Sequence, residues 1–575
     1  MFAASPVLLS GCASLQKMKK NADKISYTVT PEVLETHGGV VDLGIQGRIP
    51  EKYFIKKATI TATPVIKSAT GETAYTPYIL QGESVKANNK VISYTDGGSF
   101  NYKGSVPYNE GMRKSDLEIR IRATKGKSTL DFPSRKIAEG VIATSTLVDN
   151  SPLTIVGFQK KKNTTGVYDP TIDVFQRIVP DQYIADLLYL INSSEVRGKE
   201  LTKDEIARLN KYIVDAYTAD RKELKGVEIS AYASPDGKYD LNSKLAEKRE
   251  GSASKVVESD LKKNKVNTDV KTKNTPEDWE GFKALMEKSN IQDKDLILRV
   301  LSMYSDPEVR EREIKNLSSA FTSVADDILP QLRRAKITAA VDLIGKTDDE
   351  IMTLALNDPS KLNQAELLYA STLTTDPQVQ KKIFTSFTKI FADDWRGFNN
   401  LGTVEYNLGE KETAAASFQK ADELDPKNPV VQNNLGVIAL KNNELIKAEE
   451  LFGAASGAGK EVNENLGILK IKQGQYETAV KYLGEGSQNV ANRALAQLLA
   501  GDNNGALHTL NGAPVESGRI AYLKAIIAAR TAKTSMFYES LGTAINKDIA
   551  YRALARTDLE FAKYFDEQNF KLLVP

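Results

Sequence analysis

"FNNLGTVEYNLGEKETAAASFQKADELDPKNP" (residues 398–429) is followed by "QNNLGVIALKNNELIKAEELFGAA" (residues 432–455), and the two stretches are copies of one pattern. The equivalent pairs, each 34 residues apart, are Leu401 and Leu435, Gly402 and Gly436, Ala414 and Ala448, Phe418 and Phe452, and Ala421 and Ala455. A third copy follows at Leu466, Gly467 and Ala479, 31 residues beyond the second. Self-similarity at this period predicts stacked helix pairs, each contacting only its neighbours.

The small residues of the repeat let two helices approach closely, and the Leu and Phe side chains fill the space between them. These positions are therefore expected in the core. The pattern resembles the tetratricopeptide repeat (TPR), with Pro426 as the helix-ending proline. The resemblance implies an α-helical TPR solenoid over residues 346–575, with weaker copies on both sides of the clear ones, and a concave face that docks a protein partner.

The rest of the 575-residue chain is too long for one further core, so several domains are expected. Between Ile25 and Ser151, short alternating runs such as "ATITATPVI" and "LEIRIRA" are interrupted by glycine-containing turns. Alternation with frequent breaks predicts a β-sandwich over residues 25–151. A fold alone does not define a function, so this domain could be a spacer, a docking module or a sugar-binding module.

Composition argues against two classes of function. The 77 Lys and Arg residues nearly balance the 75 Asp and Glu residues, so no net field favours nucleic acid as a partner. His37 and His508 are the only histidines, and they fall in separate predicted domains. A glycosidase with paired carboxylates is the one chemistry that composition leaves open. The sequence therefore predicts a non-enzymatic protein with no metal and no other cofactor.

The N-terminus carries the only cysteine of the chain, Cys12, after the apolar run from Phe2 to Gly11. That run is too short to span a bilayer but suits the end of a signal peptide. "LSGC" resembles the bacterial lipobox, which implies a diacylglycerol and palmitate-type acyl anchor on Cys12. Residues 1–24 are thus expected to be a signal-peptide remnant, a lipobox and a lysine-rich tether, solvated or lying on lipid. No acidic cluster follows Cys12, which favours the periplasmic face of the outer membrane.

The middle of the chain reads as mixed α/β over residues 171–342. Strand, helix and strand patterns lead to "AYASPDGKYDLNSKLAEKR" (residues 231–249), a loop that follows a strand and opens a charged helix. Ligands commonly bind at the carboxyl ends of strands in such arrangements.

From Ala185 to Asp342 the sequence resembles an OmpA-like, peptidoglycan-associated domain of Bacteroidetes type. The motif residues in register are Gly237, Asn242, Leu245 and Arg249, whereas Ser234 stands where the family has its ligand-binding Asp. "EDWEGFKALMEKSNIQDKDLILRVLS" and "ILPQLRRAKIT" resemble the helical insert and the closing strand of that family.

The resemblance implies a peptidoglycan-binding loop formed by Ser234, Asp236, Gly237, Asn242 and Arg249. Arg249 would grip a carboxylate of the diaminopimelate in a stem peptide. The alternative is that Arg249 and Asn242 only pin the loop to its helix. Asp236 would either replace the missing carboxylate or simply form the turn before Gly237.

Together these patterns predict a multidomain α+β protein with an N-terminal β-sandwich, an OmpA-like α/β domain and a C-terminal TPR solenoid. Its expected function is that of a periplasm-facing outer-membrane lipoprotein, a scaffold that links a membrane protein complex to peptidoglycan in the cell envelope. The alternative is an accessory subunit of an assembly, secretion or uptake machine, whose OmpA-like domain binds protein and not peptidoglycan.

Overall fold

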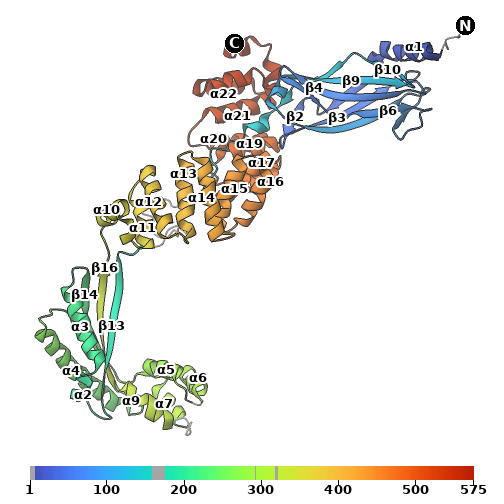
Figure 1. Ribbon diagram of the computed structural model, residues 1–575. Helices are drawn as coiled ribbons and strands as arrows, with labels where there is room; N and C mark the ends of the chain where they lie inside the picture. Colours follow the sequence, from blue (N-terminus) through green and yellow to red (C-terminus); the bar gives the residue numbers. More distant parts are fainter. Residues whose placement is uncertain (1–6, 158–174, 292, 317–321) are drawn as a thin grey trace. The chain divides into compact units, whose positions relative to one another are not determined.

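The computed structural model describes residues 7–157, 175–291, 293–316 and 322–575 (Figure 1). The chain divides into two compact units. The first combines residues 1–171 with residues 375–575, and the second is residues 172–374. Strand-rich and helical segments that lie far apart in the sequence therefore share the first unit.

The N-terminal region is strand-rich, as predicted. One sheet has the order β1-β3-β2-β12 with β8 beside β3, and the other has the order β10-β9-β4-β6-β7 with β11 beside β9 and β5 beside β4. The strands are β1 Ser26–Thr30, β2 Leu34–His37, β3 Val40–Ile49, β4 Thr59–Ser68, β5 Gly71–Ala74, β6 Tyr78–Gly82, β7 Lys90–Ile92, β8 Gly98–Pro107, β9 Ser115–Lys125, β10 Ser128–Asp131, β11 Arg135–Glu139 and β12 Val141–Ile142. Alternate residues of β9 are buried, and they pack with residues of β3 and β8 into a core between the sheets.

Helix α1 (Val7–Lys20) precedes the strands. Its Leu15 and Met18 are buried in the core at one end of the sandwich, and the Tyr53 hydroxyl donates a hydrogen bond to the Met18 carbonyl at 3.0 Å. The lysine-rich segment expected as a tether is therefore in part a helix packed on the sandwich. The sequence interpretation missed this because it took the lysines as solvated and gave no weight to Leu15 and Met18, the two apolar residues beside them.

The C-terminal part of the first unit is helical throughout its described length, in antiparallel pairs (Figure 1). Its helices are α12 Pro377–Ile390, α13 Trp395–Asn407, α14 Lys411–Leu424, α15 Pro429–Lys441, α16 Leu445–Ala454, α17 Glu461–Lys472, α18 Tyr476–Tyr482, α19 Val490–Leu499, α20 Asn503–Asn511, α21 Gly518–Arg530, α22 Thr534–Lys547, α23 Ala550–Ala555, η7 Leu559–Tyr564 and α24 Gln568–Leu573. Helix α15 shows how such a helix begins: the Asn428 side chain accepts from the Val430 N–H, and Pro429 takes the first position.

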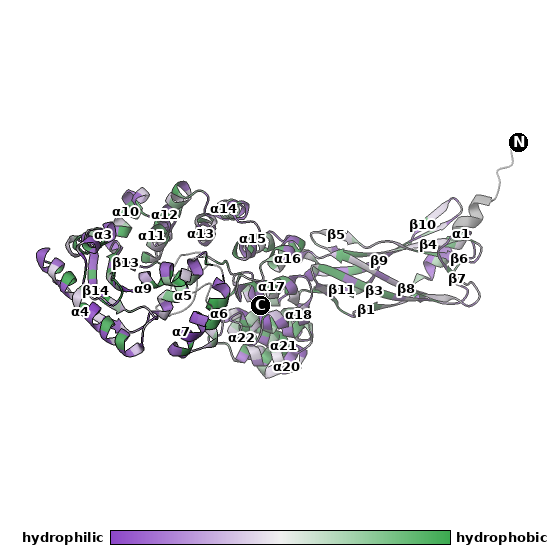
Figure 2. Ribbon diagram, turned by 90° about the horizontal axis from the view of Figure 1, so that it is seen from below, coloured by the Kyte–Doolittle hydropathy of each residue, from purple (hydrophilic) through white to green (hydrophobic). Residues whose placement is uncertain are grey.

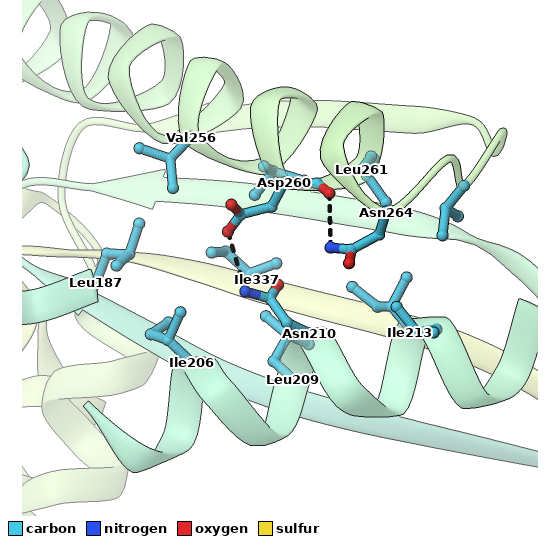
Figure 3. Close-up of a pocket in the computed structure, with 13 residues that line it drawn as sticks. Leu187, Ile206, Leu209, Asn210, Ile213, Val256, Asp260, Leu261, Asn264 and Ile337 are labelled. Carbon is cyan, nitrogen blue, oxygen red and sulfur yellow. Dashed lines mark hydrogen bonds between the residues drawn. The ribbon is translucent and has the colours of Figure 1, made fainter. Parts of the chain in front are cut away.

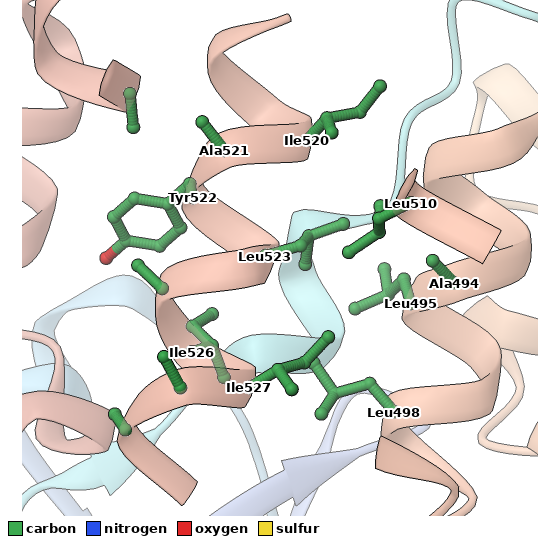
Figure 4. Close-up of a cluster of buried hydrophobic side chains, with 14 of the residues drawn as sticks. Ala494, Leu495, Leu498, Leu510, Ile520, Ala521, Tyr522, Leu523, Ile526 and Ile527 are labelled. Atoms are coloured by element: carbon green, nitrogen blue, oxygen red, sulfur yellow. The ribbon is translucent and has the colours of Figure 1, made fainter. Parts of the chain in front are cut away.

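The glycine, alanine and phenylalanine positions predicted as the core of the repeat are buried, whereas the predicted core leucines are only partly buried. Phe418 is fully buried, and a Cβ on Gly402 would lie only 2.8 Å from its ring. The same relation holds for Gly436 and Phe452, at 2.6 Å. Leu401 is only partly buried. Hydrophobic and hydrophilic residues are interspersed along these helices (Figure 2), and the apolar side chains of α19, α20 and α21 meet in one cluster (Figure 4).

The sandwich packs directly on the helical repeats within the first unit. The His37 ring lies 2.7 Å from the Tyr476 hydroxyl, and Thr144 donates to the Glu560 carboxylate at 2.5 Å. A Cβ on Gly140 would lie 2.6 Å from the Leu559 side chain, so the two parts approach closely there. Neither part of this unit is isolated from the other.

The second unit is built on a four-stranded sheet with the order β13-β16-β14-β15, in which only β14 and β15 are parallel. Its strands are β13 Ile178–Leu188, β14 Lys222–Tyr232, β15 Val270–Thr275 and β16 Arg334–Ile344. Its helices are α2 Gly198–Leu201, α3 Asp204–Thr218, α4 Tyr239–Lys263, α5 Trp279–Lys288, α6 Lys294–Met303, α7 Pro307–Asn316, η4 Val324–Ile328, α9 Leu329–Leu332, α10 Asp348–Asn357 and α11 Gln364–Ala370. Helices α3 and α4 share one core with the sheet, while α5, α6, η4 and α9 form a second core.

Candidate functional site

The loop predicted to bind peptidoglycan lies between β14 and α4, as expected from its sequence. Asn242, which is 4% exposed, donates hydrogen bonds to the carbonyls of Ser234 and Gly237, both at 3.0 Å. A Cβ on Gly237 would lie 2.9 Å from the Asn242 carbonyl oxygen. Asn242 thus pins the loop to the first turn of the helix.

Arg249 lies under this loop and is fully buried. Its guanidinium donates to the carbonyls of Ser193, Tyr232 and Leu190 at 2.9, 2.8 and 3.1 Å and lies over the Tyr189 ring. Burial lowers the pKa of Arg249 to about 10, so the group is still charged at neutral pH. These bonds agree with the alternative in which Arg249 and Asn242 pin the loop to its helix. A role for Arg249 in gripping a ligand carboxylate stays a prediction.

Ser234 and Asp236 contact the guanidinium of Arg333, a residue that the sequence interpretation did not include in the site. The Ser234 hydroxyl donates to the Asp236 carboxylate. Arg333 donates to the Ser234 oxygen at 3.2 Å and lies 3.4 Å from Asp236. Arg333 follows α9 and directly precedes β16, whose register against β14 brings it to the loop. The signal in the sequence was the Arg333-Arg334 pair before the closing strand.

An apolar gap lies between α3 and α4 of the second unit (Figure 3). It is lined mainly by core side chains such as Leu209, Ile213 and Leu261, and Asn210 donates to Asp260 at 3.0 Å across it. The gap is part of the packing between the two helices.

The repeats bind a segment of the same chain, residues 149–157, hereafter called the strap, which makes a turn at Ser151 and Pro152 and then continues from Leu153 to Gly157 outside any helix or strand. Asn434 accepts from the Val156 N–H at 2.7 Å and donates to the Val156 carbonyl at 2.6 Å. Asn465 makes the same pair of bonds with Thr154, at 2.8 and 2.9 Å. Each of these two asparagine amides therefore binds one strap residue, and it does so only through the main-chain N–H and carbonyl of that residue.

The pattern continues along the solenoid. Asn492 accepts from the Asp149 N–H at 2.7 Å and donates to the Asp149 carbonyl at 2.8 Å. Asn434 and Asn465 both directly precede a Leu-Gly pair, so they are equivalent residues of successive repeats, and Asn400 holds the same position one repeat earlier. The strap runs in the direction opposite to the order of the repeats.

A second row of asparagines supports the first. Asn399 donates to the Val156 carbonyl at 3.2 Å, and Asn433 donates to the Thr154 carbonyl at 3.0 Å. The rows are also joined, since Asn434 donates to the Asn399 oxygen at 2.8 Å and Asn465 donates to the Asn433 oxygen at 2.9 Å. We call Asn399, Asn433, Asn434, Asn465 and Asn492 the asparagine ladder. None of the five is more than 1% exposed.

The side chains of the strap add an apolar requirement. Leu153 and Ile155 are 6% and 9% exposed and belong to the core cluster that contains Phe418. A Cβ on Gly157 would lie 2.3 Å from the Thr403 hydroxyl oxygen, so the strap approaches the groove closely at that point. The groove thus accepts an extended chain with apolar residues at alternate positions and no side chain at the position of Gly157.

The ladder was missed in the sequence, although "NNLG" occurs twice in the repeats. Asparagine is expected at turns and caps, so its place in the middle of a helix was the available signal. Buried amides of this kind need partners for both the oxygen and the nitrogen, and an extended main chain supplies one donor and one acceptor per residue.

The described parts of the chain contain no metal-binding cluster of side chains and no helix suited to span a membrane. Within these ranges no three His, Cys, Asp or Glu side chains group in a way that could hold a metal ion. Among the described helices, none combines the length and apolar character needed to cross a bilayer.

Residues 396–428, within the solenoid, match the model of the tetratricopeptide repeat family, which confirms the prediction of these repeats in the C-terminal part. The chain is similar to a tetratricopeptide repeat protein from Parabacteroides merdae at 14% identity and a TM-score of 0.28, over 46% of this chain and 96% of that one. It is similar to pilF from Pseudomonas aeruginosa at 16% identity and a TM-score of 0.30, over 39% and 100% of the two chains. It is also similar to PilW, a type IV pilus biogenesis factor, at 18% identity and a TM-score of 0.29, over 40% and 98%. No curated protein matches the sequence.

Proposed function

We propose that this protein is a non-catalytic adaptor whose solenoid binds an extended segment of a protein partner. The asparagine ladder carries the proposal, because it already binds the main chain of three strap residues, Asp149, Thr154 and Val156, while Leu153 and Ile155 of the strap pack into the core of the repeats. Tetratricopeptide repeats are typical of protein-interaction scaffolds, which agrees with this role.

Site-specific photo-crosslinking in the native cell tests the proposal. A crosslinking amino acid replaces Tyr406, which lines the groove beside the strap, and in a control it replaces Ile446, which is 78% exposed on α16. A discrete adduct with one partner is expected from position 406 and none from position 446. Equal or absent adducts at both positions would contradict partner binding in the groove.

Attachment to the outer membrane through a lipid on Cys12 is part of the proposal. The lipobox-like "LSGC" supports it, and only Ala13 and Ser14 separate Cys12 from Leu15, which is buried against the sandwich. A lipid on Cys12 would hold the sandwich within a few residues of the bilayer. Cys12→Ser should move the protein to the soluble periplasmic fraction, while persistence in the membrane would mean another anchor. Digestion by protease added to intact cells would contradict the periplasmic face.

For the second unit we propose an OmpA-like role at the cell wall. The sheet order, with its one parallel pair, and the register of Gly237, Asn242 and Arg249 support that resemblance. With Ser234 in place of an acidic residue, binding of a diaminopimelate muropeptide is expected to be weak, in the millimolar range. Ser234→Asp should strengthen it by about tenfold or more in an NMR titration.

The alternative is that the second unit binds protein as part of an envelope machine. Sedimentation with purified sacculi separates the three possibilities. Co-sedimentation that is strengthened by Ser234→Asp supports wall binding, release of soluble fragments would reveal a hydrolase, and absence of both favours the protein-binding alternative.

A further inference from the structure

We propose that the strap is an intramolecular ligand that keeps the solenoid groove closed to free peptides. When the strap is released, the groove takes an extended peptide with apolar residues at alternate positions. This inference rests on the proposed function, since it names how the partner-binding site is regulated and what chemistry the partner segment has.

Three observations distinguish the strap from an ordinary part of the core. Its residues are joined to the repeats by bonds to main-chain atoms, which any non-proline sequence could supply. The asparagines that make these bonds follow the periodicity of the repeats and not that of the strap. The strap precedes the asparagines that bind it by 243 to 343 positions in the chain.

Part of the strap has the spacing of an extended bound peptide. Asn465 binds Thr154 and Asn434 binds Val156, so this step of one repeat corresponds to two residues of the strap, whereas the step from Asn492 to Asn465 spans five positions, from Asp149 to Thr154. Between these residues Ile155 turns its side chain into the core, as the alternation of an extended chain requires. The bonding pattern is that of β-strand recognition, in which main-chain bonds give affinity and alternate side chains give specificity.

Tethering explains why the groove is closed. The strap follows the sandwich directly, and Arg519 donates to the Leu147 carbonyl at 2.9 Å just before it. A segment held at one end acts at an effective concentration on the order of a millimolar. A free copy of the same peptide at about 10 μM is therefore outcompeted roughly 100-fold. A partner must bind more tightly than the strap, or bind after the strap has been displaced.

The test uses the full chain and a fluorescein-labelled synthetic peptide with the sequence of residues 149–157. Leu153→Asp with Ile155→Asp releases the strap, because two charges would have to enter the apolar core. Fluorescence anisotropy should show no saturable binding to the unmodified protein up to about 100 μM and micromolar binding to the released variant. Gly157→Val, which places atoms on Thr403, serves as a second way to release the strap if the first variant does not fold.

Three controls test whether the peptide is recognised through its main chain. Adding Asn434→Ala and Asn465→Ala to the released variant should weaken peptide binding at least tenfold, and so should N-methylation of the peptide at the two positions that donate to these asparagines. A peptide with Thr154 replaced by Val should bind as before, since the ladder does not contact that side chain through a hydrogen bond.

Equal binding by the unmodified and released proteins would overturn the inference, as would a folded released variant that does not bind the peptide. In the second case a crosslinked partner at position 406 would leave the adaptor function intact and place its recognition outside the ladder. Conversely, peptide binding without any crosslinked partner would support the inference while contradicting the proposed function.

Discussion

Replacing Asn434 by alanine tests how much the asparagine ladder stabilises the first unit. The change removes both bonds to Val156, the bond to the Asn399 oxygen and the bond that Asn434 accepts from the Asn433 amide, which still donates to the Thr154 carbonyl. The Val156 carbonyl keeps a partner because Asn399 also donates to it, at 3.2 Å. The Val156 N–H and the Asn399 oxygen are left buried and unpaired, at about 1–3 kcal/mol each. The free energy of unfolding should therefore fall by about 2–6 kcal/mol.

Urea unfolding followed by tryptophan fluorescence provides the assay. The two tryptophans are Trp279 in the second unit and Trp395 in the first, so a Trp279→Phe background reports the first unit alone. Asn442→Ala is the matched control, since Asn442 is exposed at the end of the same helix, and it should change stability by less than about 0.5 kcal/mol. If Asn434→Ala is no more destabilising than the control, the ladder does not hold the strap in solution.

Three further changes probe the rest of the fold. Phe418→Ala should destabilise the first unit by about 3–5 kcal/mol in the same assay, and by more than Leu401→Ala, because Phe418 is fully buried and Leu401 only partly; equal effects would contradict this packing. Burial raises the pKa of Asp558 to about 6, so the stability that protonated Asp558 contributes is present at about pH 4 and lost as the pH rises through 6. In Asp558→Asn the amide oxygen can accept from the Glu560 N–H while the amide nitrogen donates to the Tyr522 hydroxyl oxygen, so this change should stabilise the protein by on the order of 2–3 kcal/mol at pH 7 and by little at pH 4, and a pH-independent difference between the two proteins would refute the assignment. Arg249→Ala leaves three carbonyls without this donor and should lower the stability of the second unit by about 3 kcal/mol or more, followed by the tryptophan of that unit; a loss of muropeptide binding without a loss of stability would instead support its ligand role.

The repeat helices were predictable because their signal is local. Gly402 and Phe418 have equivalents 34 residues later, Gly436 and Phe452. Recurrence at such a fixed spacing is typical of a stack of similar helix pairs. The strands of the sandwich were equally visible in the alternation of β9.

The ladder and the docking of the sandwich were not predictable in the same way. Their partners lie hundreds of residues apart, as with Thr154 and Asn465 or His37 and Tyr476. Hydrophobic periodicity carries no information on which distant segment fills a groove. The strap itself has no repeating pattern of side chains that would identify it as the segment bound in the groove. Arg333 was missed for a related reason, since its position depends on strand register and not on the motif around Gly237.

The central claim is that the asparagine ladder binds the strap through main-chain hydrogen bonds. Amide hydrogen exchange of the intact protein tests this claim most directly. The Thr154 and Val156 N–H groups should exchange slowly in the unmodified protein, because each donates to a buried asparagine. In Asn434→Ala with Asn465→Ala they should exchange rapidly while the sandwich strands stay protected. Rapid exchange at both positions in the unmodified protein, or slow exchange that survives loss of both asparagines, would contradict the account.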